Sequence, residues 1–488
     1  MEESRGTTVQ PRYDVVVIGS GFGGAVAACR LAARGLAVAV LERGRRWGRT
    51  DFPRGDSPPA VWRFTRESNG LFELVSSRRL DLLVAAGVGG GSLVYTNVQA
   101  RAPVETFDGR WPRVVTRKLL DPYYDRVREM LTPSPAPFTS PKTRRFEAAA
   151  AKAGLGDRFH KPDLAIYWGH QGEEVTNRFG APQTGCIQCG YCIIGCHVHA
   201  KNTLDLNYLR AAENQGAAVF PLTEVVDIAP VPGGYRVGFE RRRNKTRGEV
   251  EASRVIVSAG TLGTNRLLLN ARDRGALPRL SARLGDGFSD NGDFFGAVLG
   301  AGEVRPAEGP TVTSALDFSD EGHYLLEGGL PDFIAAKIEG PVKLLGLGRR
   351  GVGKATDSLL PLFFMGRDAG DGRLFLDAAS QLRVEWKHRE SHALFSRMEA
   401  RLREIGSALG GRAMTSPTWW LRRKLIGVHP LGGCALAESP EKGVVSESGE
   451  VFGYPGLYVA DGSVIPGALG VPPSMTIAAV AERIVEGV

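Results

Sequence analysis

The stretch YDVVVIGSGFGGAVAACRLAARGLAVAVLERG at residues 13–44 decides the fold. An apolar run at 15–18 predicts a buried strand, and a glycine turn separates it from a helix of small residues at 25–33. A second apolar strand follows at 37–41. Two short buried strands joined by a helix are typical of a parallel sheet, so the sequence predicts an α/β fold with a Rossmann-type domain.

The turn inside this stretch has the pattern G-x-G-x-x-G, with Gly19, Gly21 and Gly24 as its glycines and Phe22 between them. Such glycines allow a tight turn, a close approach of the backbone to a pyrophosphate, and close packing of the helix. The N-terminus of the helix also favours negative charge. Glu42 ends the second strand, where an acid can bind the hydroxyls of a ribose. We therefore expect a dinucleotide site here.

Length and composition set limits for the rest of the chain. With 488 residues it exceeds the usual size of one core and predicts two or three domains. Hydrophobic residues make up 43% and charged residues 23%, which is ordinary for a globular protein. The 63 glycines are about twice the average usage, and many lie in short runs where backbone can approach a ligand closely.

The distribution of charge and the lengths of the apolar runs argue against nucleic-acid binding and against a membrane-spanning segment. The formal net charge is +8, but the excess is scattered arginine, so nucleic acid is not expected as a partner. The densest basic run, RRRNKTR at 241–247, lies between strand-like segments and predicts a solvated hairpin tip, with a phosphate-binding patch as the alternative. No apolar stretch precedes the first strand, and none is long enough to span a membrane. We expect a cytoplasmic protein.

Six further motifs, taken with the first, carry a resemblance over essentially the whole chain. They are GVGGGSLVYTN at 87–97, GTLGTNRLLL at 260–269, NGDFFG at 291–296, MGRDAGDGRLFLD at 365–377, HPLGGC at 429–434 and YVADGS at 458–463. In this order they resemble the glucose-methanol-choline (GMC) oxidoreductase family, in its cholesterol-oxidase-like branch. The resemblance implies FAD as cofactor and oxidation of an alcohol carbon, with hydride passing to the flavin.

The resemblance also assigns cofactor contacts. It implies that Glu42 binds the adenosine ribose and that Val225 lies near the adenine. Asp461 would lie near the pyrophosphate and the ribityl chain. The second glycine-rich loop would follow the pyrophosphate and isoalloxazine with residues Gly89, Gly90, Gly91 and Ser92.

We expect the cofactor domain to be built from discontinuous segments. Residues 12–109, 186–297 and 425–488 would form its three parts, the second with the cysteine loop and the third with the catalytic loop. Residues 110–185 look like an insertion or lid with one helix. Residues 298–424 look like an antiparallel-sheet substrate domain with helical cover, in which the amphipathic run SHALFSRMEARLREIGSAL at 391–409 predicts a long helix.

His429 is the candidate catalytic residue. An alcohol gives up hydride readily only if its hydroxyl proton also leaves, and an imidazole that titrates near neutral pH is suited to accept or position that proton. The chain has only eight histidines, and this one lies in the HPLGGC loop. An isolated histidine in such a loop would instead be read as one that stabilises a turn.

One position departs from the pattern of this branch, which has an asparagine beside the flavin before the final helix. The chain has Pro472 there, within the sequence GVPP. Proline offers no side-chain hydrogen bond and no backbone donor. We expect Asn97 or Ser474 to supply the missing contact to flavin or substrate.

Four cysteines, Cys186, Cys189, Cys192 and Cys196, follow the spacing C-x2-C-x2-C-x3-C of bacterial ferredoxins. The spacing favours a 3Fe-4S or 4Fe-4S cluster that takes electrons from the flavin. Structural zinc and redox-active thiols are the alternatives. Zinc sites usually draw their ligands from two separated knuckles, which this chain lacks in sequence.

We therefore expect an enzyme that oxidises an alcohol group on a largely apolar small molecule, such as a sterol or terpenoid. Its electrons would leave through the cluster to an acceptor, which can be a protein. Two alternatives remain open: an oxidase that uses oxygen alone, with structural cysteines, and a non-catalytic flavin and cluster protein that relays electrons. The substrate cannot be identified further from the sequence.

Overall fold

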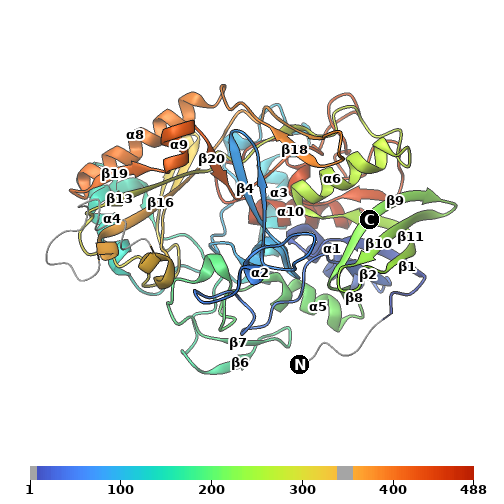
Figure 1. Cartoon of the computed structure of the whole chain (residues 1–488), viewed down its shortest axis with the longest axis horizontal. Helices are drawn as coiled ribbons and strands as arrows, with labels where there is room; N and C mark the ends of the chain where they lie inside the picture. Colours follow the sequence, from blue (N-terminus) through green and yellow to red (C-terminus); the bar gives the residue numbers. More distant parts are fainter. Residues whose placement is uncertain (1–7, 338–354) are drawn as a thin grey trace.

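A computed structural model describes residues 8–337 and 355–488. Figure 1 shows two sheet regions side by side, with the strands that begin the chain in one and most of the strands that follow residue 290 in the other. The first strand, at residues 12–18, and the last helix, at residues 474–486, both belong to the first region. The expected α/β fold with a second, antiparallel-sheet region is confirmed.

The first region contains a seven-stranded sheet in the order β8-β2-β1-β11-β10-β9, with β21 also paired to β11. Strands β8, β2, β1, β11 and β21 are parallel, and β10 and β9 add an antiparallel edge. The strands are β1 (Arg12–Ile18), β2 (Val38–Leu41), β8 (Ala218–Phe220), β9 (Thr223–Val231), β10 (Gly234–Arg241), β11 (Arg247–Val257) and β21 (Leu457–Val459).

Helix α1 (Phe22–Ala32) packs between α10 (Ser474–Glu486) and α5 (Tyr208–Asn214), so the two ends of the chain meet on this sheet. The fully buried Glu482 accepts hydrogen bonds from Arg30 and from the Tyr208 hydroxyl, each at 2.8 Å. A buried carboxylate held by a guanidinium and a hydroxyl stabilises this junction. Removing one partner would leave the carboxylate buried and poorly compensated.

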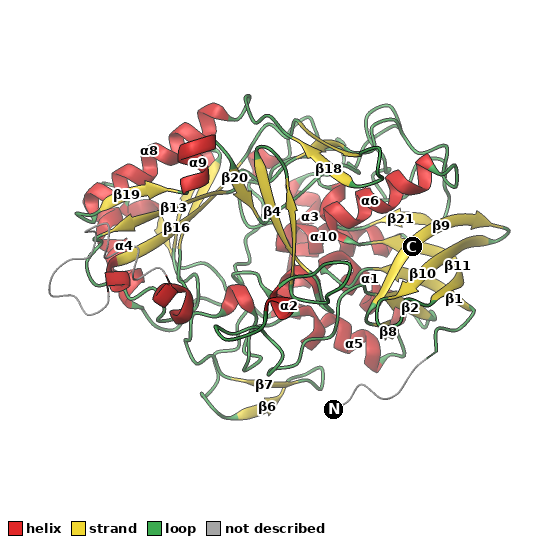
Figure 2. Ribbon diagram, viewed as in Figure 1, coloured by secondary structure: helices red, strands yellow, loops and turns green. Residues whose placement is uncertain are grey.

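The second region is a six-stranded antiparallel sheet in the order β19-β13-β16-β15-β14-β5. The long helix α8 (His392–Ala408), predicted from its amphipathic sequence, packs on one face together with α4 (Pro141–Lys152), as Figure 2 shows. The strands are β5 (Phe159–His160), β13 (Phe294–Leu299), β14 (Ala315–Phe318), β15 (His323–Glu327), β16 (Leu359–Gly366) and β19 (Arg412–Thr415).

Smaller elements join the two regions. Three small sheets have the orders β12-β17-β18, β20-β4-β3 and β6-β7. Their strands are β3 (Phe72–Ser76), β4 (Leu80–Ala85), β6 (Glu174–Thr176), β7 (Pro182–Thr184), β12 (Asp286–Phe288), β17 (Gly372–Leu376), β18 (Leu382–Glu385) and β20 (Leu425–Gly427). Other α-helices are α2 (Pro59–Trp62), α3 (Arg117–Leu131), α6 (Gly260–Asp273) and α9 (Pro417–Arg422), and residues 332–337 are also helical.

The region 110–185 differs from the expectation of an irregular insertion with one helix. It contains two long helices, α3 and α4, and its strand β5 extends the six-stranded sheet by pairing with β14. The signal for α4 is local: Ser140 accepts a hydrogen bond from Thr143 N as N-cap, Pro141 occupies the first turn, and alanines fill the helix. No helix in the described ranges is long and apolar enough to cross a membrane.

Candidate active site

Two glycine loops meet at the carboxyl end of β1. Gly90 has a φ of 54°, and a Cβ on it would lie 2.7 Å from the Cα of Gly21. Gly89 N donates to Ser20 Oγ at 3.1 Å, which ties the second loop to the first. The contact joins segments that are about seventy residues apart in sequence, and only glycine at position 90 allows it.

The space beside these loops fits a flavin dinucleotide. A Cβ built on Gly21 or Gly91 would meet nothing within 4 Å, so the backbone there is open to a ligand. The Asn97 side chain is fully buried, yet neither its amide nitrogen nor its oxygen has a hydrogen-bond partner. Buried amides are nearly always paired, so an unpaired one beside an open glycine cradle indicates a missing group. Phe22 contributes an edge-to-face contact with Tyr95.

Glu42 lies at the end of β2, as predicted. Its Oε2 accepts from Ser20 N at 3.0 Å and Ser20 Oγ at 2.7 Å, and its Oε1 accepts from Gly44 N at 2.7 Å. Burial raises the pKa of this carboxyl, while these donors act in the opposite direction. Val225 follows on β9, just beyond the Thr223 N–Glu42 O hydrogen bond. Both residues therefore border the edge where the adenosine half of the cofactor is expected.

Asp461 lies in the turn after β21 and makes four hydrogen bonds within the protein. Its Oδ2 accepts from Gly260 N at 2.9 Å and Thr264 Oγ1 at 2.5 Å, and its Oδ1 accepts from the amide and hydroxyl of Ser463. The preceding residue is also close to the first helix, because a Cβ on Gly23 would overlap Ala460 O. The carboxylate thus joins the last strand to the start of α6 beside the expected pyrophosphate.

His429 forms a pair with an acid that the sequence analysis left without a role. Its Nδ1 lies 2.7 Å from Asp293 Oδ1, and Asp293 Oδ2 accepts from Val428 N at 2.8 Å. The Asp293 side chain has no solvent exposure, whereas that of His429 is 27% exposed. A carboxylate at Nδ1 holds the proton there and leaves Nε2 as the acceptor. Asp293 belongs to the NGDFFG motif, and this motif was the only sequence feature that could have pointed to it as the partner of His429.

The same motif holds the loop that contains Pro472. Asn291 Oδ1 accepts from Leu469 N at 2.8 Å and Gly470 N at 3.0 Å, and its Nδ2 donates to Val471 O at 2.8 Å. Asn291 adopts a left-handed φ of 53°, which asparagine tolerates better than most residues. One short turn therefore orients both the histidine and the final loop.

Two more buried acids lie around this turn. Asp290 is fully buried with no partner for either oxygen, and burial, followed by the charges of Asp293 and Asp368, raises its pKa well above the usual range. Burial also raises the pKa of Asp368 to about 6, although Ser289, Gly292 and Gly370 donate to it. The turn thus raises the pKa of both acids near the His429–Asp293 pair, that of Asp290 further than that of Asp368.

Of the two residues expected to replace the missing amide, only Asn97 has a free side chain. Ser474 Oγ donates to Val98 O at 3.5 Å and lies at the start of α10. Pro472 is buried next to Val471 in the loop held by Asn291. The buried Glu327 on β15 accepts from Thr313 N at 3.1 Å and from the Thr143 hydroxyl, so its Oε1 is bound within the protein.

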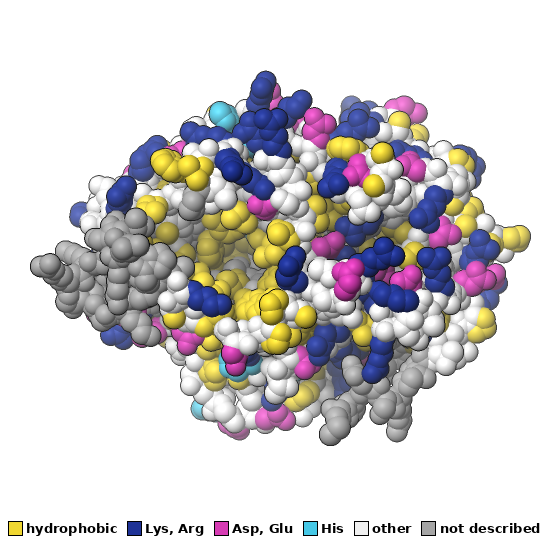
Figure 3. Space-filling view, in the orientation of Figure 1, with side chains coloured by type: hydrophobic (Ala, Val, Ile, Leu, Met, Phe, Trp, Pro, Cys, Tyr) yellow, Lys and Arg dark blue, Asp and Glu magenta, His cyan; other side chains and the backbone are white. Residues whose placement is uncertain are grey.

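The walls towards the substrate region are apolar. The face of the six-stranded sheet opposite α8 carries the partly exposed Phe295 and Phe363, whose ring centroids are 5.4 Å apart. Figure 3 shows a hollow walled by hydrophobic side chains between this region and β4. Val428, 37% exposed, directly precedes His429 on the β4 side.

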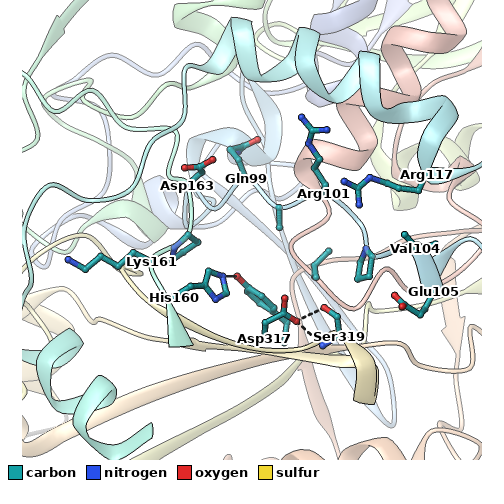
Figure 4. A pocket seen from close by; sticks show the side chains of 15 residues that line it. Gln99, Arg101, Val104, Glu105, Arg117, His160, Lys161, Asp163, Asp317 and Ser319 are labelled. Carbon is teal, nitrogen blue, oxygen red and sulfur yellow. Dashed lines mark hydrogen bonds between the residues drawn. The ribbon is translucent and has the colours of Figure 1, made fainter. Parts of the chain in front are cut away.

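A separate polar cavity of about 560 Å³ is lined by neither His429 nor the glycine loops. Figure 4 shows Arg101, Arg117, His160 and Asp317 around it. His160 Nε2 lies 2.6 Å from the Tyr324 hydroxyl, and both arginines contact Asp121. Its mixed charges and internal pairing distinguish it from the apolar hollow.

The four cysteines of the predicted cluster lie near one another, because the other three thiols all raise the pKa of Cys186 beyond the effect of burial. In the described part of the chain, however, no three His, Cys, Asp or Glu side chains are arranged to hold a metal ion. All six cysteines are free thiols. The geometry therefore does not fit a bound cluster, and the cluster stays a prediction.

A buried lysine connects this cysteine loop to the second glycine loop. Lys201 Nζ donates to Cys192 O at 2.7 Å, Leu93 O at 3.0 Å and Tyr95 O at 2.8 Å. Burial lowers its pKa to about 8. Lys201 lies outside the motifs quoted above, so its role could not be predicted from the sequence. It positions the cysteine loop against the cofactor loop.

The Rossmann-type sheet, the two apposed glycine loops and the histidine–carboxylate pair define a flavin-type oxidoreductase. Comparison with known proteins agrees: GMC oxidoreductase family models match residues 13–272 and 387–481. The chain belongs to the GMC oxidoreductase family and is an enzyme that acts on CH–OH donors.

Relatives and a solved structure extend this result. The chain is 31% identical to a cholesterol oxidase of Acinetobacter baumannii, over 96% of this chain and 93% of the relative. It is 32% identical to a cholesterol oxidase of Mycobacterium tuberculosis, over 97% and 91%. A long-chain-alcohol oxidase of Arabidopsis thaliana is 25% identical, over 96% and 66%. Pyridoxine 4-oxidase from Mesorbium loti shares the fold, with a TM-score of 0.65 at 15% identity over 97% and 98% of the two chains.

Proposed function

We propose that this enzyme uses FAD to oxidise a hydroxyl group on a largely apolar small molecule of sterol or terpenoid type, with His429 handling the proton. The observation that carries the proposal is the His429 Nδ1–Asp293 Oδ1 contact of 2.7 Å. When bound, FAD supplies the acceptor for the hydride. The protein must supply the base, and His429 is placed to do so.

Asp293 prepares His429 for this role. With the proton held on Nδ1, the lone pair of Nε2 is free to accept the hydroxyl proton of an alcohol. The carboxylate then stabilises the imidazolium that forms. Because Asp293 is fully buried, water does not compete for its contact with the ring. The tautomer and the ring orientation are therefore set before substrate binds.

The substrate class follows from the walls and the relatives. Phe295 and Phe363 are partly exposed apolar side chains of the six-stranded sheet, and the exposed Val428 directly precedes His429. Figure 3 shows a hollow walled by hydrophobic side chains on this side of the molecule. Burying apolar surface contributes about 25 cal/mol per Å², so a large apolar alcohol gains most from such walls. The relatives named as cholesterol oxidases and a long-chain-alcohol oxidase support an apolar alcohol over a sugar.

The test compares His429→Ala and His429→Gln with the wild type in anaerobic stopped-flow mixing with a 3-hydroxysterol and with a long-chain alcohol. We expect both variants to keep FAD and to reduce it at least about a hundredfold more slowly. Unchanged flavin reduction would assign the base elsewhere. Failure of both alcohols, with a small polar alcohol accepted, would overturn the substrate class.

The route by which electrons leave the flavin is a separate proposal, and no step above depends on it. The C-x2-C-x2-C-x3-C spacing alone supports an iron–sulfur cluster and a dehydrogenase. Iron and acid-labile sulfide are measured in anaerobically purified protein, with a Cys189→Ser/Cys192→Ser variant as control. Three or four irons per chain, lost in the variant, would support the cluster. Zinc or no metal would favour an oxygen-using oxidase.

A further inference from the structure

An exposed apolar surface lies on α9 and the small sheet β20-β4-β3. Trp420 and Leu421 on α9 are 75% and 68% exposed, the highest values among large hydrophobic side chains in the described part of the chain. The neighbouring strands add three more exposed side chains: Leu74, Ile426 and Val428. We call these five residues the α9 face.

The strand register places the sheet members of the α9 face on one side. Leu74 pairs with Leu83 on β4, and two positions along, Ser76 and Ile426 both pair with Asp81. Residues two apart on a strand share a side, so Leu74 and Ile426 point the same way. The buried residues Leu80, Leu82 and Leu425 fill the opposite side.

The α9 part of the surface is held by the protein core. Trp419 is only 4% exposed and packs against Phe294, with ring centroids 5.4 Å apart. Arg79 donates to Arg422 O at 3.1 Å, which fixes the end of α9 to the start of β4. With Trp419 directed inwards, the next residues are directed into solvent. Exposure of Trp420 and Leu421 is therefore built into the fold.

Basic side chains border the same surface. Arg422, Arg423 and Lys424 follow Leu421 directly, and Arg78 lies on the turn between β3 and β4. Arg422 and Arg78 are exposed and have no ion-pair partner within residues 8–337 and 355–488. Figure 3 shows hydrophobic side chains over α9, with Lys and Arg side chains next to them.

We propose that the α9 face docks on a lipid surface that contains anionic headgroups. An exposed Trp and Leu can enter the boundary between lipid headgroups and acyl chains. The basic side chains at the border attract the negative charge of the headgroups. Val428, a member of the α9 face, directly precedes His429, so this surface lies next to the candidate base in the chain. The inference rests on the proposed function, since an apolar alcohol partitions into lipid.

A second copy of the chain fits this surface less well. A symmetric dimer places the same patch of both copies in contact. The basic borders of the two copies, with Arg422 and Arg78, would then be brought together, and like charges there cost free energy. Asp81 and Glu399 are already paired with Lys424 and Arg423, so the unpaired charge at this border is basic, and an anionic lipid surface complements it.

Vesicle binding without substrate tests the proposal directly. The holoenzyme is sedimented with vesicles of phosphatidylcholine alone and of phosphatidylcholine with 30% phosphatidylglycerol. We expect binding to the anionic vesicles that weakens with salt and is stronger than to the neutral ones. Trp420→Ser/Leu421→Ser should weaken it about tenfold or more, and Arg422→Gln/Arg78→Gln should weaken it on anionic vesicles. Val114→Ser, at a 50% exposed apolar position outside the surface, is the matched control.

Further readouts separate docking from catalysis and from self-association. Oxidation of a water-soluble short alcohol should stay unchanged in the Trp420→Ser/Leu421→Ser variant, while oxidation of a vesicle-borne sterol falls. Brominated lipid should quench tryptophan fluorescence less in Trp420→Phe. Equal vesicle binding by wild type and variant would overturn the proposal. So would a wild-type dimer that the variant converts to monomer. Loss of turnover with vesicle binding intact would instead point to the proposed function.

Discussion

At the scale of single residues, a carboxylate with no solvent exposure determines how the candidate base is presented. Asp293 contacts both the His429 ring and the backbone of Val428, so it fixes the side chain and its loop together. Neither contact can be read from residue spacing, because Asp293 and His429 are 136 positions apart. The sequence predicted the histidine and left its partner in a quoted motif without a role.

Asp293→Asn should therefore slow flavin reduction by about 10²–10⁴-fold while FAD stays bound, since a carboxylate that orients a catalytic imidazole has effects of this size. An asparagine keeps the shape but loses the charge that stabilises the imidazolium. The apparent pKa in the pH–rate profile should accordingly fall. A purely structural residue would lower the amount of folded holoenzyme and leave that profile unchanged, which would contradict the assignment.

Asp290→Asn tests the neutral acid beside this pair. An acid whose pKa is raised in the folded state stabilises the fold below its unfolded pKa, and the contribution is lost as pH rises through the folded pKa. Over that window the wild type should lose about 1.4 kcal/mol per pH unit from this group. The variant should show a flatter pH dependence in denaturant unfolding above about pH 4, the unfolded pKa of an aspartate. If the free energy of unfolding depends on pH equally in wild type and variant, the pKa of Asp290 is not raised in the folded protein.

At the scale of elements, the turn 289–293 connects three parts of the molecule. Asn291→Ala would remove three hydrogen bonds to the backbone at 469–471 and leave buried amides unsatisfied. We expect a loss of about 2 kcal/mol or more in the free energy of unfolding. Limited proteolysis should also cut the Pro472 loop faster. Asn270→Ala, on the exposed side of α6, is the control, and equal stability of both variants would contradict the role of the turn.

Elements with a local signal were predicted correctly, and those fixed by distant contacts were not. The hairpin at 241–247 and α8 follow from turn residues and periodicity, and both are confirmed, although Arg242 in the hairpin tip is buried instead of solvated. Helix α4 was missed although Ser140 and Pro141 mark its start, because the surrounding segment was interpreted as irregular. Strand β5 has only two residues and exists through its pairing with β14, which no local pattern indicates.

At the scale of the whole molecule, the cofactor site is built where distant segments converge, and one substitution there isolates binding from folding. A Cβ on Gly21 meets nothing within 4 Å, so Gly21→Val should fold as the apoprotein yet fail to retain FAD. Chromatography of the released cofactor and thermal unfolding of the protein measure the two effects. Gly109→Val, at another glycine with open surroundings, should keep its flavin. Flavin-replete Gly21→Val would contradict the cradle.

The order of the motifs along the chain predicted that these segments converge. The residues that connect them are identified only by the folded structure. The glycine fingerprint, Glu42 and Asp461 follow β1, β2 and β21 of one sheet, and their contacts with the cofactor stay predictions. The Gly90–Gly21 contact and the Lys201 hydrogen bonds depend on tertiary packing, which a linear spacing does not encode. The cysteine spacing shows the reverse case, since its local signal is strong but the folded loop presents no metal-ready arrangement among the described residues.

The parallel pairing of β21 with β11 has a consequence for biosynthesis. Strand β21 and helix α10 occupy residues 457–486, yet they cover β11 and pack on α1 in the sheet that the first residues begin. Until this segment leaves the ribosome, the exposed edge of β11 and the apolar side of α1 have no partner. A nascent chain of this protein must therefore remain incompletely folded through most of its synthesis, and it is during this interval that chaperone binding would protect it.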